Sequence, residues 1–284
     1  MRASFAAELL KVGRRPAMWL VAVVWLVLSL VFGYLFPYLS YRGAPTGPAA
    51  GAGEASAEEV LAEALPANLV PTAIQGFPVF AGALALLLGV LSAGSEYGWG
   101  TWKTILAQGP GRLAVLAGKL GALGLVLLLV VLATFAVAAP ASWLVAWVES
   151  QLVRWPPLAE LAQGLAAGWL VVAMWGWAGM FLGILVRGTS LAIGLGLVWT
   201  LAVENLVRGF ASLLAAIDTL QRWLPGTNAG SLAAAVGVPV QGAPGGTPGV
   251  TATVDGTRAT LVLAAYLVAF TVAAAVLLQR RDVT

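Results

Sequence analysis

Residues 120–139 read LGALGLVLLLVVLATFAVAA, a run of twenty residues without a charge. A helix of this length crosses the roughly 30 Å hydrocarbon core of a bilayer. The whole chain has the same character, since 60% of its 284 residues are hydrophobic, 10% are charged and the mean hydropathy is +0.92. Soluble domains carry about 25% charged residues. The sequence therefore predicts an integral membrane protein.

Working outward from this run, comparable apolar stretches recur on both sides. Six spans are predicted, at residues 17–36, 73–93, 120–139, 165–186, 190–207 and 259–278, with Pro140 ending the third. The predicted fold is an all-α polytopic membrane protein, a single transmembrane domain over residues 1–284. A cleaved signal peptide is the alternative for the first run, but that run is longer than a usual h-region.

The connecting segments differ in composition and position. Outer loops are expected at residues 40–71, 140–160 and 209–258, the first with a short helix near residues 57–65. Interfacial helices are expected at residues 1–16, within 141–160, and in the first part of 209–258 along the face that carries Phe210, Leu213, Leu214, Ile217 and Leu220. The Gly- and Pro-rich residues 237–249 are expected to form a loop.

The basic residues predict the orientation. With both termini inside, the inner segments hold ten of the 15 Lys and Arg residues and the outer segments hold five. This bias follows the positive-inside rule. The termini and the segment 94–119 are therefore expected in the cytoplasm, and the chain is expected to be a multi-pass protein of the cell inner membrane.

Segment 94–119, GSEYGWGTWKTILAQGPGRLAVLAGK, is a polar break between two spans. Its glycines and Pro110 predict a short helix that begins near Trp99 or Thr101 and ends near Gln108. One face of this helix would be apolar, because four side chains fall at helical spacing: Trp99, Trp102, Ile105 and Leu106. Two helical turns are not stable alone in water, so the helix is expected to dock on something.

Composition excludes several kinds of site. The chain has no Cys and no His, which excludes a thiolate, an imidazole base, a Cys/His zinc site and a Ser-His-Asp triad. It also lacks the P-loop pattern G-x-x-x-x-G-K-[ST]. The chain is therefore not expected to be an enzyme or to bind a cofactor itself. Nucleic acid is not expected as a partner, because the basic residues flank apolar spans.

Three charged residues of segment 94–119 are candidates for a lock at the inner mouth of the bundle: Glu96, Arg112 and Lys119. The alternative is that Arg112 and Lys119 only anchor the loop at the membrane surface. An acidic residue is not needed for orientation, so Glu96 carries the hypothesis of a lock.

Glu204 is the acidic residue within a predicted span. A carboxylate at the centre of a membrane helix costs on the order of 3 kcal/mol, so it should face protein or water. Arg208, at i+4, is a candidate partner. Two interpretations remain open: an outer gate or substrate contact that includes Asn205, or a structural ion pair.

Two pairs of glycines have the small-x3-small spacing that lets membrane helices approach closely, Gly164 with Gly168 and Gly179 with Gly183. They are expected to serve packing among the six spans, with a dimer interface as the alternative.

A family resemblance rests on residues Glu96 to Lys119. Their pattern, E-x3-GTW-x3-L-x2-GP-x-R-x6-K, resembles the first cytoplasmic loop of ABC transporter permeases of the type-2 exporter class. Six spans and a basic amphipathic start are also similar to that family. One departure is that many members have Pro-x-x-Arg where this chain has Pro110-Gly111-Arg112.

The resemblance implies a permease that forms half of a transmembrane pathway with a second permease subunit, identical or different. A separate ATP-binding-cassette ATPase would hold ATP and Mg and drive alternating access for a hydrophobic or amphipathic substrate. The loop helix would couple to that ATPase, and the implied coupling residues are Glu96, Trp99, Thr101, Trp102, Ile105, Leu106 and Arg112. The alternative is a secondary transporter or channel, although such proteins usually carry charges in several spans.

Overall fold

A computed structural model describes residues 2–43, 56–107, 109, 111–211, 214–243 and 245–281. These residues are helical wherever they are regular, and the described part of the chain contains no β-strand, only one isolated bridge between Gln241 and Ala243. Within the same residues, six helical segments are long and apolar enough to cross a membrane. The all-α polytopic fold is confirmed.

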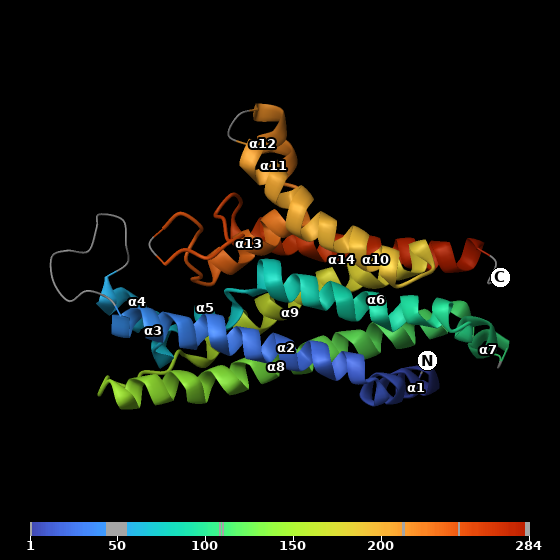
Figure 1. Cartoon of the computed structure of the whole chain (residues 1–284). Coiled ribbons are helices and arrows are strands. Elements are labelled where there is room, and N and C mark those ends of the chain that lie inside the picture. The colour runs from blue at the N-terminus through green and yellow to red at the C-terminus, as the bar shows by residue number, and fades with distance from the viewer. Residues whose placement is uncertain are drawn as a thin grey trace.

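The six segments are longer than predicted. They are Pro16–Gly43, Pro66–Gly98, Arg112–Val148, Leu158–Val186, Ser190–Phe210 and Gly256–Arg280. Apart from the last part of the fifth, they run alongside one another in Figure 1, with both chain termini and α7 (Thr101–Ala107) at one end, called here the terminal end. The helices α3 (Phe36–Gly43) and α4 (Ala57–Glu63) lie at the opposite end. The helix α4 confirms the short helix predicted in the first outer loop.

Three of the segments contain irregular turns. The first consists of α2 (Pro16–Leu30), the π-turn η1 (Val31–Leu35) and α3, and the second of η2 (Pro66–Asn68), α5 (Leu69–Ile74), the π-turn η3 (Phe77–Ala81) and α6 (Gly82–Gly98). The fifth consists of α10 (Ser190–Leu197), the π-turn η4 (Val198–Val203) and α11 (Glu204–Phe210). Pro37 is the second residue of α3, just after η1, and Pro78 lies within η3. A proline lacks the N–H of a regular helical turn, and a π-turn accommodates the shift.

The third span does not end at Pro140. Helix α8 (Arg112–Val148) continues through this proline for two further turns, so the prediction that residues 141–160 form a separate interfacial element is wrong for its first half. Pro140 removes one backbone hydrogen bond. Ending the helix there, in an apolar environment, would leave many backbone N–H and C=O groups without partners. The exposed side chains of Trp143, Leu144 and Trp147 extend the apolar surface beyond the proline.

Helices α6 and α9 (Leu158–Val186) form the most closely packed pair of the bundle. A Cβ atom on Gly89 would overlap the carbonyl oxygen of Gly176, and one on Gly179 would overlap that of Leu86. The two backbones are therefore in direct contact. Gly164 and Gly168 likewise face Val70 and Phe77 of the second segment. Both glycine pairs are used for packing within the chain, as predicted.

The fifth segment leaves the bundle. In Figure 1, α11 and the following α12 (Ala215–Gln221) project away from the other helices. Its apolar side chains are largely exposed, including Leu195, Val198 and Leu206. Helix α12 lies in the region predicted as interfacial, but Phe210 belongs to α11 and Leu213 lies outside the described residues.

The sequence did not predict α13 (Pro225–Ala235). Its residues from Pro225 to Ala233 are all buried, and it packs against α14 (Gly256–Arg280) and η3. The predicted outer loop 209–258 therefore folds back into the bundle. Within its Gly- and Pro-rich part, residues 237–243 and 245–249 are irregular as predicted.

Candidate functional site

The polar segment between the second and third spans lies at the terminal end. Helix α6 ends at Gly98, α7 runs from Thr101 to Ala107, and α8 begins at Arg112. Gly100 and Gly109 bracket α7 with φ angles of +66° and +98°, a left-handed conformation that glycine adopts readily. The prediction of a short helix stopped by glycines is confirmed.

The predicted apolar face of this helix is only partly buried in the structure. Trp99 precedes α7 and is 66% exposed, whereas Trp102 is 1% exposed and packs against the ring of Tyr97, with centroids 5.4 Å apart. Ile105 packs partly against the core, and the side chain of Leu106 lies outside the described atoms. Trp99 is therefore accessible at this end of the bundle, whereas Trp102 is covered by the chain itself.

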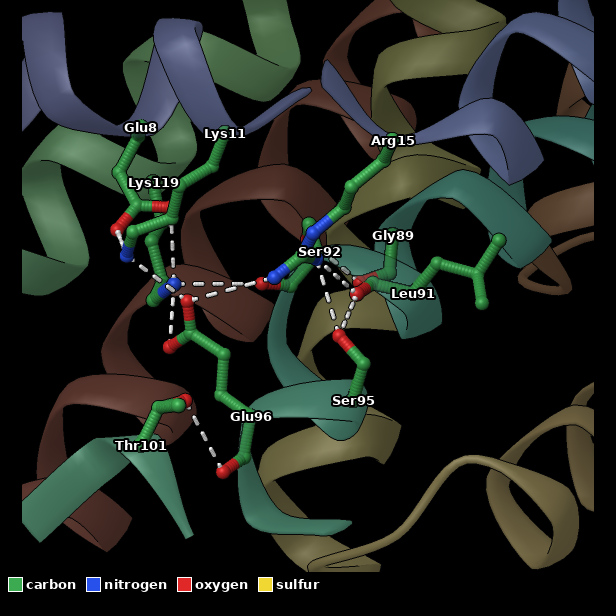
Figure 2. Close-up of polar contacts among 10 residues, drawn as sticks. All are labelled: Glu8, Lys11, Arg15, Gly89, Leu91, Ser92, Ser95, Glu96, Thr101 and Lys119. Atoms are coloured by element: carbon green, nitrogen blue, oxygen red, sulfur yellow. Dashed lines mark hydrogen bonds and ion pairs between the residues drawn. The ribbon is translucent and has the colours of Figure 1, made fainter. Parts of the chain in front are cut away.

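Beneath α7 lies a cluster of five charged side chains from four parts of the chain, shown in Figure 2. Glu8 and Lys11 come from α1 (Arg2–Arg14), Arg15 from the link to α2, Glu96 from α6 and Lys119 from α8. Residues far apart in sequence thus meet at one point.

Four of these side chains form a closed ring of alternating charge. The Lys11 Nζ lies 2.6 Å from Glu8 Oε1 and 3.0 Å from Glu96 Oε1. The Lys119 Nζ lies 3.0 Å from Glu8 Oε2 and 2.7 Å from Glu96 Oε2. Each carboxylate oxygen therefore has an ammonium partner. We call Glu8, Lys11, Glu96 and Lys119 the ion ring.

The ion ring is largely buried. Glu96 and Lys119 are each 1% exposed and Glu8 is 6% exposed. An unpaired charge at such a position is strongly destabilising, and mutual pairing offsets the cost of desolvation. The Lys119 Nζ also donates to the carbonyl oxygen of Ser92 at 3.3 Å and lies 5.2 Å from the centre of the Trp102 ring. The ring thus holds α1, α6 and α8 together directly below α7.

Arg15 connects the ion ring with the exposed tryptophan. Its Nη2 lies 3.8 Å from Glu96 Oε1, and its Nη1 donates to the Leu91 carbonyl at 2.9 Å and to Ser95 Oγ at 3.0 Å. The guanidinium carbon lies 5.0 Å from the centre of the Trp99 ring. Trp99 is therefore in contact with the charged cluster although it is itself exposed.

The predicted lock of Glu96, Arg112 and Lys119 forms only in part. Glu96 pairs with Lys119, and Thr101 Oγ1 donates to the Glu96 carbonyl at 3.4 Å. Arg112 lies elsewhere and donates to the carbonyl oxygens of Leu278 and Arg281 at 2.8 and 2.9 Å, at the carboxyl end of α14. The Arg112 guanidinium group thus provides hydrogen bonds for the last carbonyl groups of α14 and lies at the negative end of the helix dipole. Lys119 is buried, so a role as a surface anchor does not fit it.

Sequence reasoning missed Glu8, Lys11 and Arg15. One signal was present, since Glu8 is the sole acidic residue among the first sixteen, and Lys11 follows it at helical spacing. An acid in an otherwise basic segment calls for a partner. The identity of that partner, 111 residues away at Lys119, depends on the fold.

The second predicted group of site residues is not assembled as expected. Glu204 is fully buried and accepts hydrogen bonds from Trp199 Nε1 at 3.1 Å and from the backbone N–H of Gly226 at 3.0 Å. Within the part of the chain that the structure describes, no salt bridge joins Glu204 to Arg208, so the predicted pair is not in direct contact, although the two charges still attract each other over a longer distance. The first turn of α13 takes the expected place of the arginine.

Asn205 points elsewhere. It is exposed, and its Nδ2 donates to the Leu201 carbonyl at 2.7 Å. Asn205 therefore does not join Glu204 in one site, and Glu204 serves to fasten α11 to α13.

Within the described residues, no group of three or more His, Cys, Asp or Glu side chains is arranged to hold a metal ion. No protein-family model matches the chain, and no curated protein matches it. The features that bear on its function are therefore the six membrane helices, the exposed end of segment 94–119 and the ion ring beneath it.

Proposed function

We propose that the chain is the permease subunit of an ATP-binding-cassette exporter in the cell inner membrane, with both termini in the cytoplasm. The observation that carries this proposal is the arrangement of α7 on the ion ring. A short helix at the terminal end lies over a buried polar cluster that joins three long or terminal helices. Such an arrangement suits a point at which an external protein applies force.

The route of force can be followed through named contacts. A partner would dock on the exposed surface around Trp99 and Thr104. Displacement of α7 would act on Trp102, whose ring lies against Lys119. Because Lys119 bridges Glu8 and Glu96, α1, α6 and α8 would move together. The buried Trp102 transmits the motion in this scheme, and the exposed Trp99 makes the contact.

The partners follow from the proposal. A separate ATPase would bind ATP and Mg, because this chain has no P-loop. A second permease subunit would complete the pathway, and the exposed apolar surface of the fifth segment offers it a contact area. The substrate would be hydrophobic or amphipathic and would move by alternating access.

The test uses co-expression of the tagged chain with the P-loop ATPase encoded nearest to its gene. Association and vanadate-sensitive ATP hydrolysis are measured for the complex in nanodiscs. Trp99→Ala should lower both about tenfold or more, because exposed aromatic side chains that fill a partner's groove dominate binding. The matched control is Trp147→Ala, a tryptophan 68% exposed on α8 at the opposite end, which should leave both unchanged.

Equal association of the two variants would contradict the assignment of the docking surface. Substrate movement that persists in vesicles containing the chain without any ATPase would contradict the proposed function and would favour a secondary transporter or channel.

A further inference from the structure

A cavity of about 300 Å³ lies in the half of the bundle away from the termini. Its walls come from α2 and η1, from α5, η3 and the start of α6, and from residues 245–248 of the Gly- and Pro-rich loop. This volume lies at the lower end of the range typical of sites for small organic ligands.

The cavity is apolar at its inner end and polar at its outer end. Trp25, Leu28 and Leu84 lie along the spans toward the middle of the bundle. Glu63 ends α4 just before the second membrane segment begins at Pro66, so it lies close to one end of that segment. A ligand lying along this gradient has an apolar body and a polar end beside Glu63.

The carboxyl group of Glu63 gives the polar end its charge. It is half-buried, and burial together with the nearby Glu59 raises its pKa. Among the described residues, no Lys or Arg lines the cavity and no ion pair reaches Glu63. These residues therefore supply no cation for the carboxyl group.

The loop is shaped to close over this carboxyl group. Gly245 has a φ of +70°, and a Cβ atom on it would overlap Glu63 Oε1, so the backbone lies directly against the acid. Nearby, Thr247 Oγ1 donates to Gln75 Oε1 at 3.5 Å. Glycine at this position permits the contact, and the acid is enclosed without being neutralised.

The side of the cavity that faces away from the bundle is bordered by aromatic rings. Phe32 and Phe80 are 51% and 49% exposed, and their rings stack with centroids 6.0 Å apart. Both belong to membrane segments, so this border faces lipid. The two rings therefore form an apolar wall between the cavity and the surrounding lipid.

We propose that this cavity binds amphipathic amines, with the ammonium group beside Glu63 and the apolar body between the aromatic walls. An ammonium supplies the charge that Glu63 lacks and interacts favourably with aromatic faces. An anion would be repelled by Glu63 and Glu59, and a neutral ligand would leave the acid unpaired. The proposal concerns binding by the chain itself and does not depend on an ATPase partner.

Three ligands of matched shape test the charge selectivity: 4-phenylbutylamine, 4-phenylbutanol and 4-phenylbutyrate. Their equilibrium binding to the full chain in phosphatidylcholine nanodiscs is measured against empty nanodiscs. The amine should bind at least about tenfold more tightly than the alcohol and the acid, because a hydrogen bond between charged groups contributes more to the binding free energy than one between neutral groups. Equal binding of all three would overturn the proposal.

Variants of α4 locate the site. Glu63→Gln should weaken amine binding by about ten- to hundredfold, and Glu63→Asp should keep the preference for the amine. The matched control is Glu58→Gln, which removes the same charge from an exposed position on the same helix and should leave binding within about twofold. Unchanged amine binding in a folded Glu63→Gln variant would overturn the proposal.

Both free amines and lipids carry such an ammonium group, and nanodiscs with phosphatidylethanolamine separate these two sources. Weaker apparent amine binding in such discs identifies the lipid ammonium as the occupant, and unchanged binding identifies a free amine.

Discussion

Replacing Glu96 by Gln tests the ion ring directly. In the wild-type chain two carboxylates, Glu8 and Glu96, face three cations, Lys11, Arg15 and Lys119. The substitution leaves three cations facing one carboxylate in a buried site. Removing one partner of a buried ion pair costs about 3–5 kcal/mol, because the remaining charge stays desolvated.

The lower end of this range applies here. Lys119 keeps Glu8 at 3.0 Å and the Ser92 carbonyl at 3.3 Å, so it is not left alone. We therefore expect a loss of about 3 kcal/mol. In a large domain, each kcal/mol of lost stability lowers the melting temperature by roughly 2–4 °C. We expect the melting temperature of the purified protein, followed by tryptophan fluorescence in detergent, to fall by about 6–12 °C.

The control is an exposed ion pair of the same chain. The Oδ2 atom of Asp218 on α12 lies 2.6 Å from Nη2 of Arg222, the residue that follows this helix. Asp218→Asn should leave the melting temperature unchanged because solvent screens the pair. The double variant Glu96→Gln/Lys119→Met should lose less stability than the two single losses added together, since it removes both partners. The reasoning is refuted if Glu96→Gln melts like the wild type, or if the two losses simply add.

Two further predictions concern packing and pH. Gly179→Ala should destabilise the protein by about 1–3 kcal/mol, because its Cβ would overlap the Leu86 carbonyl, whereas Gly194→Ala, with open space around the added Cβ, should be neutral or stabilising in the same melting assay. Burial raises the pKa of Glu63, so the native chain binds a proton on this carboxyl group more tightly than the unfolded chain does. The melting temperature of the wild type, compared with that of Glu63→Gln, should therefore rise as the pH is lowered from about 7 to about 5. A difference between the two melting temperatures that does not depend on pH would contradict this.

The division between local and tertiary information is clear in segment 94–119. The short helix was predicted because Gly100 and Gly109 act on the backbone next to them, and their positive φ angles are local properties. The separation of Trp99 from Trp102 was not predicted. Both are large apolar side chains at helical spacing, and only packing against Tyr97 and Lys119 determines which of them is buried.

The same division explains the errors at the other end of the bundle. Pro140 was expected to end the helix because the proline ring disfavours a helix in water. In an apolar environment, however, backbone groups without hydrogen-bond partners cost more free energy than a proline within the helix. Helix α13 was missed because its composition, rich in Gly, Ala, Ser and Thr, resembles a loop. The contact of Gly226 with Glu204, which helps to hold α13 in place, joins residues that no local pattern connects.

The sequence by itself determined the fold class and the number of membrane helices, because hydropathy acts over each run of about twenty residues independently of the rest. It also determined the short helix between the second and third spans. Only the tertiary structure decided that Glu8, Lys11, Glu96 and Lys119 form one ring, and that Glu63 lies in a cavity to which the described part of the chain contributes no cation. Charge pairing depends on distances of a few ångströms between atoms that are distant along the chain, and those distances are set when the helices pack.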